Sequence, residues 1–125
     1  MINSIKINQV LYNQLKNITA LGGRLYPIIA ENGADYPFLI YKRDSITSQI
    51  CKDGLYEDLV SFTIKVVTKS YAEGIEIAQN VRTILQREKI IGDDMTLYDV
   101  RLTNMTESYE YDAYIQNLNF NTKIS

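Results

Sequence analysis

Residues 55–68 carry a regular two-residue alternation that few folds can accommodate. The apolar positions on one side of it are Val60, Phe62, Ile64 and Val66. Because successive side chains of a strand point to opposite faces, this pattern predicts a strand with one buried and one wet face. Residues 113–124 repeat the pattern, and their shared apolar face holds Tyr114, Leu118, Phe120 and Ile124. The chain therefore needs a sheet that is covered on one face.

Two segments have the apolar spacing of helices and can supply that cover. In residues 3–19 the apolar positions are Ile7, Val10, Leu11, Leu15 and Ile18. Asn3 or Ser4 is a plausible N-cap of this helix, and Gly22 and Gly23 end it. Ser70 and Glu73 form a capping box that opens a second helix. Its apolar stripe is Ile75, Ala78, Val81 and Leu85, widened by Ile77 and Ile84, and residues 86–89 are its solvated end.

Three more segments read as strands, at residues 24–30, 37–44 and 95–106. Pro27 lacks an amide donor, which places the first of them at a sheet edge. The resulting order is α-β-β-β-α-β-β over a single domain, residues 1–125. With no sustained β-α alternation, we expect an α+β fold with a largely antiparallel or mixed sheet and both helices packed on one face. The connection through the second helix could make one strand pair parallel.

Residues 44–58 have two interpretations. Either the flanking strands extend into a long hairpin arm, or the segment is a mobile loop. A lone hairpin is only marginally stable in water, so an ordered arm would favour a neighbouring subunit. The candidate residues for such an assembly interface are Ile46, Gln49, Ile50, Cys51, Leu55 and Tyr56.

Composition excludes several classes of function. The chain has no histidine and one cysteine, which removes His-dependent catalytic triads, His/Cys zinc sites and intrachain disulfides. A net charge of -2 argues against a protein that binds nucleic acid by its phosphates, so we expect no sequence-specific nucleic-acid partner. The N-terminus is too polar for a signal peptide and no apolar run approaches a membrane span, so we expect a cytoplasmic protein without a membrane partner.

No catalytic, cofactor-binding or metal-binding residue is predicted, and we expect a protein that is not an enzyme and needs no cofactor. The carboxylate groupings are Glu57 with Asp58, Asp93 with Asp94, and Glu110 with Asp112. Glu57 and Asp58 would point to opposite faces of a strand, and Asp93 and Asp94 lie in a glycine-containing turn. All three groupings therefore favour a solvated surface over a metal or acid–base role, which would need converging partners. A metal-dependent hydrolase that uses Glu57, Asp93 or Asp112 is one rival interpretation. Another is a monomeric or dimeric binding module for a protein or small ligand, using its ten tyrosines.

An ordered set of short motifs runs through the chain. Residues 24–27 read Arg-Leu-Tyr-Pro, residues 37–41 read Pro-Phe-Leu-Ile-Tyr, and the second helix begins Ser-Tyr-Ala-Glu. The set resembles a phage tail-completion, or head–tail joining, family of small proteins (domain-of-unknown-function family 3168). Its motif residues here are Arg24, Tyr26, Pro27, Pro37, Tyr41, Ser70, Glu73 and Arg82, all in structural roles. Gly74 replaces a helix-favouring alanine of that pattern, at a cost of about 1 kcal/mol.

The resemblance implies a structural protein of a phage or prophage virion. Such proteins assemble as homo-oligomeric rings, commonly hexameric, that cap the tail tube and present it to the head connector, with DNA passing through the lumen. The implied partners are further copies of the chain, the tail tube and the connector. The implied location is the cytoplasm of a bacterial host during assembly, and then the virion tail. A ring requires a head-to-tail interface that closes, and residues 44–58 are the candidate for one half of it.

Overall fold

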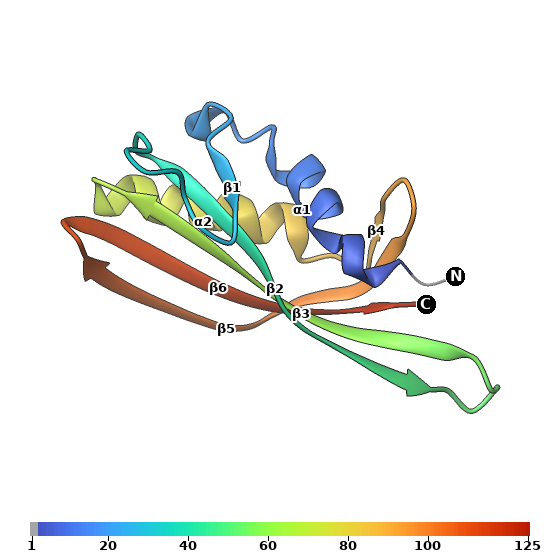
Figure 1. Ribbon diagram of the computed structural model, residues 1–125. Helices are drawn as coiled ribbons and strands as arrows, with labels where there is room; N and C mark the ends of the chain where they lie inside the picture. The colour runs from blue at the N-terminus through green and yellow to red at the C-terminus, as the bar shows by residue number, and fades with distance from the viewer. Residues whose placement is uncertain (1–2) are drawn as a thin grey trace.

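In the computed structural model, which describes residues 3–125, one six-stranded sheet carries two helices on one face (Figure 1). The helices are α1 (Ile7–Leu15) and α2 (Tyr71–Leu85), with 3-10 turns at Ser4–Lys6 and Thr19–Leu21. The strands are β1 (Leu25–Pro27), β2 (Phe38–Ile50), β3 (Tyr56–Thr68), β4 (Lys89–Ile91), β5 (Thr96–Glu110) and β6 (Ala113–Ile124). Their spatial order is β1-β2-β3-β6-β5-β4. The expected α+β fold is confirmed.

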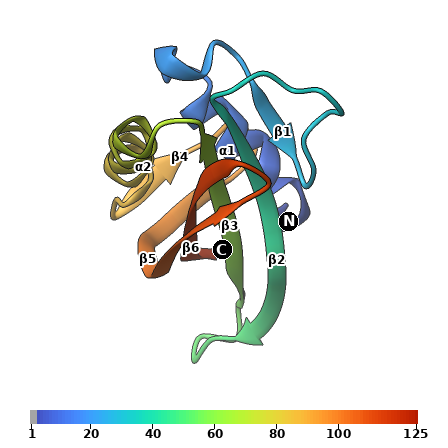
Figure 2. The ribbon, with the colours of Figure 1, turned by 90° about the vertical axis from the view of Figure 1, so that its left-hand side faces the viewer.

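The sheet is antiparallel except for β1 and β2, which run parallel at one edge. The expected edge position of the strand that contains Pro27 is confirmed. The suggestion that the α2 connection makes a parallel pair is wrong, because β6 lies between β3 and β5. Figure 2 shows the sheet strongly curled, with α1 and α2 held against its concave side. Because β3 lies next to β6, the N-terminal and C-terminal halves of the chain meet at the centre of the sheet.

The core lies between that face of the sheet and the helices. Its centre is the pair Phe62 and Phe120, whose rings stack 5.3 Å apart on the neighbouring strands β3 and β6. All four apolar positions of the 55–68 alternation are buried: Val60, Phe62, Ile64 and Val66. The five apolar positions of the first helical segment are buried too: Ile7, Val10, Leu11, Leu15 and Ile18. The alternation that predicted the sheet therefore also identified the core.

Both helices differ in detail from the expectation. The first helical segment is α1 with a 3-10 turn on each side, and Gly22, in the left-handed conformation at φ 55°, caps the second of these turns. In α2 the buried stripe includes Ile77, whereas Ile75 is 40% exposed. The buried face of α2 is thus Gly74, Ile77, Ala78, Val81 and Leu85. The helix ends at Leu85, and Lys89, predicted as part of its solvated end, is the first residue of β4, which pairs with the start of β5.

Gly74 lies where α2 passes closest to the sheet. A Cβ atom built there would stand 2.8 Å from the Thr68 hydroxyl oxygen and 3.8 Å from Cγ of Gln116. That hydroxyl donates a hydrogen bond of 2.7 Å to the Ser70 carbonyl, and Thr68 is fully buried. Glycine is therefore required by the packing, and the helix-propensity cost inferred from sequence is offset by close contact.

We expect Gly74→Ala to lower the free energy of unfolding by about 1 kcal/mol, since an overpacking cost of about 1–3 kcal/mol exceeds the propensity gain of about 1 kcal/mol. Urea unfolding followed by circular dichroism measures this directly. Glu76→Ala, on the exposed side of the same helix, is the control and should change stability by less than about 0.5 kcal/mol. A Gly74→Ala protein more stable than wild type would contradict the packing explanation.

Candidate assembly surface

The segment 44–58 is an ordered hairpin and not a mobile loop. Beyond a register shift between Arg43 and Ser45, β2 and β3 stay paired as far as Ile50 opposite Tyr56. Residues 44–58, called the arm below, project away from the helices (Figure 1). Asp44 is the extra residue at the register shift; its carboxylate accepts a hydrogen bond from the Thr63 hydroxyl and pairs with Lys42 at 3.5 Å. The base of the arm is therefore fixed to the sheet.

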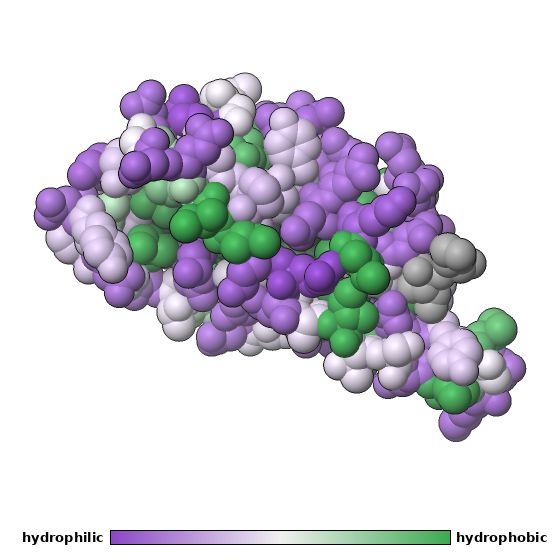
Figure 3. All heavy atoms as spheres, in the orientation of Figure 1, coloured by the Kyte–Doolittle hydropathy of each residue, from purple (hydrophilic) through white to green (hydrophobic). Residues whose placement is uncertain are grey.

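The end of the arm is apolar and exposed. Ile50 and Leu55 are each 66% exposed and Tyr56 is 61% exposed. Ile46 is half-buried and packs against the core, while Gln49 donates a hydrogen bond of 2.9 Å to Glu57 across the hairpin. An open groove runs along the same side, lined by Ser4, Ile5, Ile46, Ser48, Leu55, Tyr56, Asp58 and Ser125. Figure 3 shows separate apolar spots on the arm and near its base, each among polar side chains.

Cys51 lies at the turn of the arm, and its thiol is free. Partial burial, with the carboxylates of Glu57 and Asp53, raises the pKa of the thiol above its ordinary value of 9.0, and Lys123 offsets only part of this. The thiolate, the nucleophilic form, is therefore scarce at neutral pH. Cys51 also donates its backbone N–H to Leu55 at 2.7 Å, which closes the hairpin.

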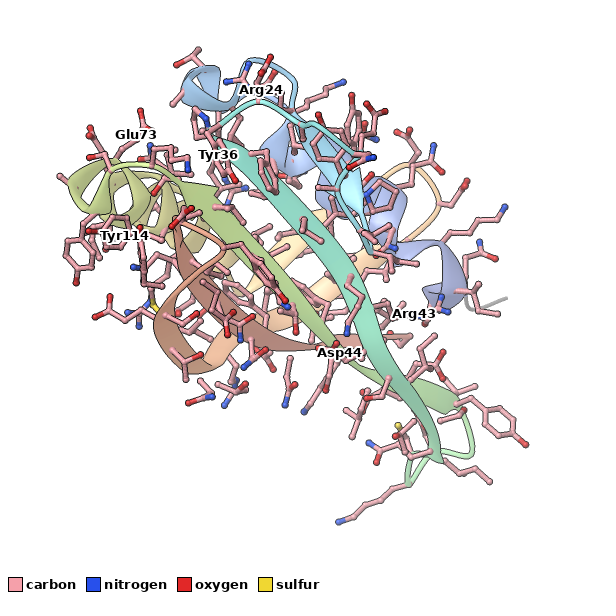
Figure 4. All side chains as sticks on the ribbon, turned by 60° about the vertical axis from the view of Figure 1, so that its left-hand side comes forward. Arg24, Tyr36, Arg43, Asp44, Glu73 and Tyr114 are labelled. Atoms are coloured by element: carbon pink, nitrogen blue, oxygen red, sulfur yellow. The ribbon has the colours of Figure 1, made fainter. Side chains whose placement is uncertain are left out.

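A second exposed surface lies at the opposite end of the sheet, and it was not foreseen from the sequence. The tight turn of Tyr111 and Asp112 joins β5 to β6, and Tyr111 is 94% exposed. Tyr114 packs edge-on against Tyr109 at 4.9 Å and against Tyr71 of α2 at 5.6 Å. The signal available in the sequence was the clustering of three tyrosines around that turn. Figure 4 labels Tyr114 at this end and Asp44 at the base of the arm.

Glu107 connects this tyrosine cluster to the sheet. Its carboxylate accepts hydrogen bonds from Gln116 at 3.0 Å and from the Tyr71 hydroxyl at 2.9 Å. These two bonds lower the pKa of Glu107 below its ordinary value of 4.5, and the same contact raises the pKa of Tyr71 above 10.0. The carboxylate therefore remains charged at neutral pH and fixes the start of α2 over β5.

This pKa shift predicts a pH dependence. A carboxyl group whose folded pKa is depressed adds stability above its unfolded pKa and loses it as the pH falls through the folded pKa. We expect wild type to lose stability on acidification from about pH 5 to pH 3 more steeply than Glu107→Gln does. Urea unfolding at a series of pH values measures the difference. Parallel curves for the two proteins would show that the Glu107 hydrogen bonds add nothing to folding.

The motif residues near β1 hold that strand and the following turn together. Arg24 donates a hydrogen bond of 2.8 Å from Nε to the Pro37 carbonyl, which follows a cis peptide bond (Figure 4). Tyr26 packs edge-on against Phe38 at 6.0 Å, and Pro27 is the last residue of β1. Tyr41 is buried against Tyr12, and burial, with a smaller effect of Tyr12, raises the pKa of its hydroxyl above 10.0. The described contacts of these residues are structural.

The motif residues of α2 lie on its exposed side. Ser70 caps the helix by accepting the Glu73 backbone N–H at 3.4 Å, so half of the predicted capping box is seen. Arg82 donates from Nε to Gln86 at 3.2 Å, one turn further along the helix. The side chain of Gln86 in turn accepts the Leu102 backbone N–H at 3.4 Å. These contacts define where α2 starts and how its end meets β5.

The carboxylate groupings do not converge. Glu57 binds Gln49 on the arm, Asp93 and Asp94 lie between β4 and β5, and Asp112 lies in the β5–β6 turn. Within residues 3–125, no group of three or more acidic, cysteine or histidine side chains is placed to hold a metal ion. In that same part of the chain, no helix combines the length and the apolar character needed to cross a membrane.

The fold has a counterpart among solved structures. No family model matches the chain, and no curated protein matches it by sequence. One similar chain belongs to a structure described as the virion of a native gene transfer agent (GTA) particle, with a TM-score of 0.75 and 15% identity. The alignment covers 91% of this chain and 90% of that chain. At this identity the similarity establishes a shared fold over nearly the whole length of both chains.

Proposed function

We propose that the protein is a non-enzymatic structural component of a phage or phage-like virion, which completes the tail by assembling as a ring at the tail tube. The observation that carries the proposal is the fold shared with a chain of a gene transfer agent virion, covering nine tenths of both chains. The ring, its hexameric state and the tail-tube and connector partners come from the motif resemblance and belong to the proposal.

The shape of the molecule supports a role in assembly. The arm exposes three large apolar side chains, Ile50, Leu55 and Tyr56, on a two-stranded projection. Contiguous exposed apolar surface is characteristic of interaction sites, and covering it would stabilise a hairpin that is marginal alone. An interface that uses two different surfaces generates a ring when its rotation closes. The tyrosine cluster at the far end of the sheet offers a second surface.

The test is the mass of the wild-type protein in solution. Light scattering after gel filtration, from micromolar to near-millimolar concentration, should show a shift from 14.4 kDa to a closed multiple of that mass. Where the chain alone stays monomeric, the same measurement is repeated with purified tail tubes, which can template assembly by mass action. A strict monomer that does not bind tail tubes would refute the proposal.

The binding-module alternative gives a different result in the same samples. A monomeric module would keep its mass at every concentration, and a ligand would raise its melting temperature. A metal-dependent hydrolase would instead gain melting temperature on addition of calcium, magnesium or manganese. An increase in mass with no response to ligands or metal ions supports the structural role.

A further inference from the structure

Two long strand edges are left open in the described part of the sheet, one on each side. On β2, strand β1 covers only residues 39–41, so among residues 3–125 the outer edge of residues 43–50 has no backbone partner. On β5, strand β4 covers residues 96–98 and the chain after α2 covers residues 99–102. Residues 103–110 of β5 are then open, and every one of them is exposed. An open edge is a ready template for pairing with another chain.

The direction of the backbone groups on the arm follows from the hairpin bonds. Cys51 donates its N–H to the carbonyl of Leu55, just before β3, so Gln49 and Thr47, which alternate with it, also bond inward. Ile46, Ser48 and Ile50 therefore point their N–H and C=O groups outward. No charged residue and no proline lies between Ser45 and Cys51, and the bulge at Asp44 falls just before this stretch, so residues 46–50 themselves carry none of these blocks to edge pairing.

The direction of the backbone groups on β5 follows from the turn that joins it to β6. Its last residue, Glu110, pairs with Ala113 across a two-residue turn, which is the position of a hydrogen-bonded pair. The outward groups are therefore those of Tyr109, Glu107 and Met105. Their side chains lie on the helix-bearing face, because Glu107 reaches Tyr71 of α2. Ile46 lies on that face too, because it packs against the core. The two open edges thus match in length and in the face that their outward residues share.

The geometry points to antiparallel pairing of the arm edge of one copy with the β5 edge of a second copy, so that one sheet continues into the next. This inference rests on the proposed function and names the interface that the ring would use. β2 and β5 run in opposite directions within the sheet, so head-to-tail stacking of sheets brings them together antiparallel. The partner is another copy of this chain because the two edges complement each other and both belong to it.

The side chains favour one register. With Ile46 opposite Tyr109, Ser48 falls opposite Glu107 and Ile50 opposite Met105. Both ends of the pairing are then apolar, and the carboxylate between them faces a hydroxyl and no like charge. Tyr109 of the second copy also comes to the groove that Ile5, Leu55 and Tyr56 line beside Ile46.

The offset between the edges fits a closed assembly. The arm and the β5–β6 turn lie at opposite ends of the strands, so each copy must be displaced along the strand direction relative to the last (Figure 1). A sheet that closes on itself requires such a stagger, because its strands must tilt relative to the axis. A sheet continued without displacement would put β1 of one copy against β4 of the other.

Disulfide trapping tests the register. In a Cys51→Ser background, Gln49→Cys and Thr106→Cys are made as separate proteins. These positions would be a non-hydrogen-bonded pair, with Cα atoms about 4.5 Å apart, inside the range of about 4.4–6.8 Å for disulfides. Each protein then carries a single cysteine, so every disulfide joins two copies. Under mild oxidation, the mixture should form disulfide-linked dimers of the two proteins. Their yield should be at least tenfold higher than the yield of homodimers from either protein alone.

Two controls follow. The first tests whether the disulfide depends on the register, and the second tests whether assembly depends on a backbone N–H. Thr47→Cys, two residues away on the same face, should link to Ser108→Cys and poorly to Thr106→Cys. Ser48→Pro removes one outward N–H while leaving the β2–β3 bonds intact, and should abolish assembly without changing the melting temperature. Ser48→Ala keeps the N–H and should assemble as wild type does.

The outcomes distinguish the inference from the proposed function. If wild type assembles while Ser48→Pro also assembles and the 49–106 link does not form, the edge pairing is wrong and the structural role stands. If the 49–106 link forms but wild type neither gains mass nor binds tail tubes, the pairing stands and the tail role is wrong. Failure of both measurements refutes both.

Discussion

A variant in which Asn-Gly replaces residues 50–56 should keep its monomer fold and self-assemble only at higher concentration. Gln49 and Glu57 form a hydrogen-bonded pair, so a two-residue turn can join them directly. The change removes the exposed side chains of Ile50, Leu55 and Tyr56 and leaves the core untouched. Burial of one such side chain contributes about 1.5 kcal/mol or more, which corresponds to roughly tenfold in an assembly constant. We therefore expect the midpoint of assembly to rise at least tenfold.

Light scattering over a concentration series measures that midpoint, and circular dichroism confirms the fold of the monomer. The matched control replaces Lys52 and Asp53 with alanine, which changes the same turn but keeps its apolar residues. This control should assemble as wild type does. An arm-shortened protein that assembles at the wild-type concentration would show that the arm has no part in the interface.

Phe62→Ala should produce the largest loss of stability among single substitutions. Phe62 is fully buried and stacks on Phe120 at 5.3 Å, at the join of the two central strands. Removal of a buried phenylalanine side chain costs about 3–5 kcal/mol, because the transfer energy is lost and a cavity remains. For a domain of this size we expect the melting temperature to fall by roughly 10–20 °C.

Urea titration measures the loss of unfolding free energy, and thermal unfolding measures the fall in melting temperature. Tyr111→Ala is the matched control, because Tyr111 is aromatic but 94% exposed, and its stability should change by less than about 0.5 kcal/mol. A loss below about 1.5 kcal/mol in Phe62→Ala would mean that the core collapses readily around the cavity. Such a result would remove the stacked pair as the centre of the fold.

Local sequence signals predicted the regular elements well where burial was one-sided. The alternation in 55–68 identified β3 and four of its buried residues, and the spacing in 3–19 identified the buried face of α1. The secondary-structure prediction failed where contacts between distant segments determine which residues are buried or paired. Ile75 fits the helical period of α2 as well as Ile77 does, but Ile77 is buried in the core and Ile75 is 40% exposed. β4 has three residues, too few for a periodic signal, and exists because β5 is there to pair with it.

The candidate site divides in the same way. The sequence indicated the candidate interface residues Ile46, Gln49, Ile50, Cys51, Leu55 and Tyr56. It did not decide whether their segment is an ordered hairpin arm or a mobile loop. The outcome depended on whether β2 and β3 stay in register past Asp44, which is a property of the pair of strands. The β5 edge gave no usable pattern, because an open edge is defined by which strands fail to cover it. The three tyrosines around the β5–β6 turn were a visible signal, but nothing local showed that Tyr71 of α2 joins them.

The sequence by itself determined that this chain builds a one-sided sheet covered by two helices, without histidine chemistry and with an arm-like segment between two strands. These properties depend on residue identity and on the spacing of residues that are close in the sequence. The tertiary structure alone decided the strand order, the ordered arm, the close approach at Gly74 and the two open edges at opposite ends of the sheet. Those depend on which distant segments meet, because strand pairing is a contact between segments that no local period encodes.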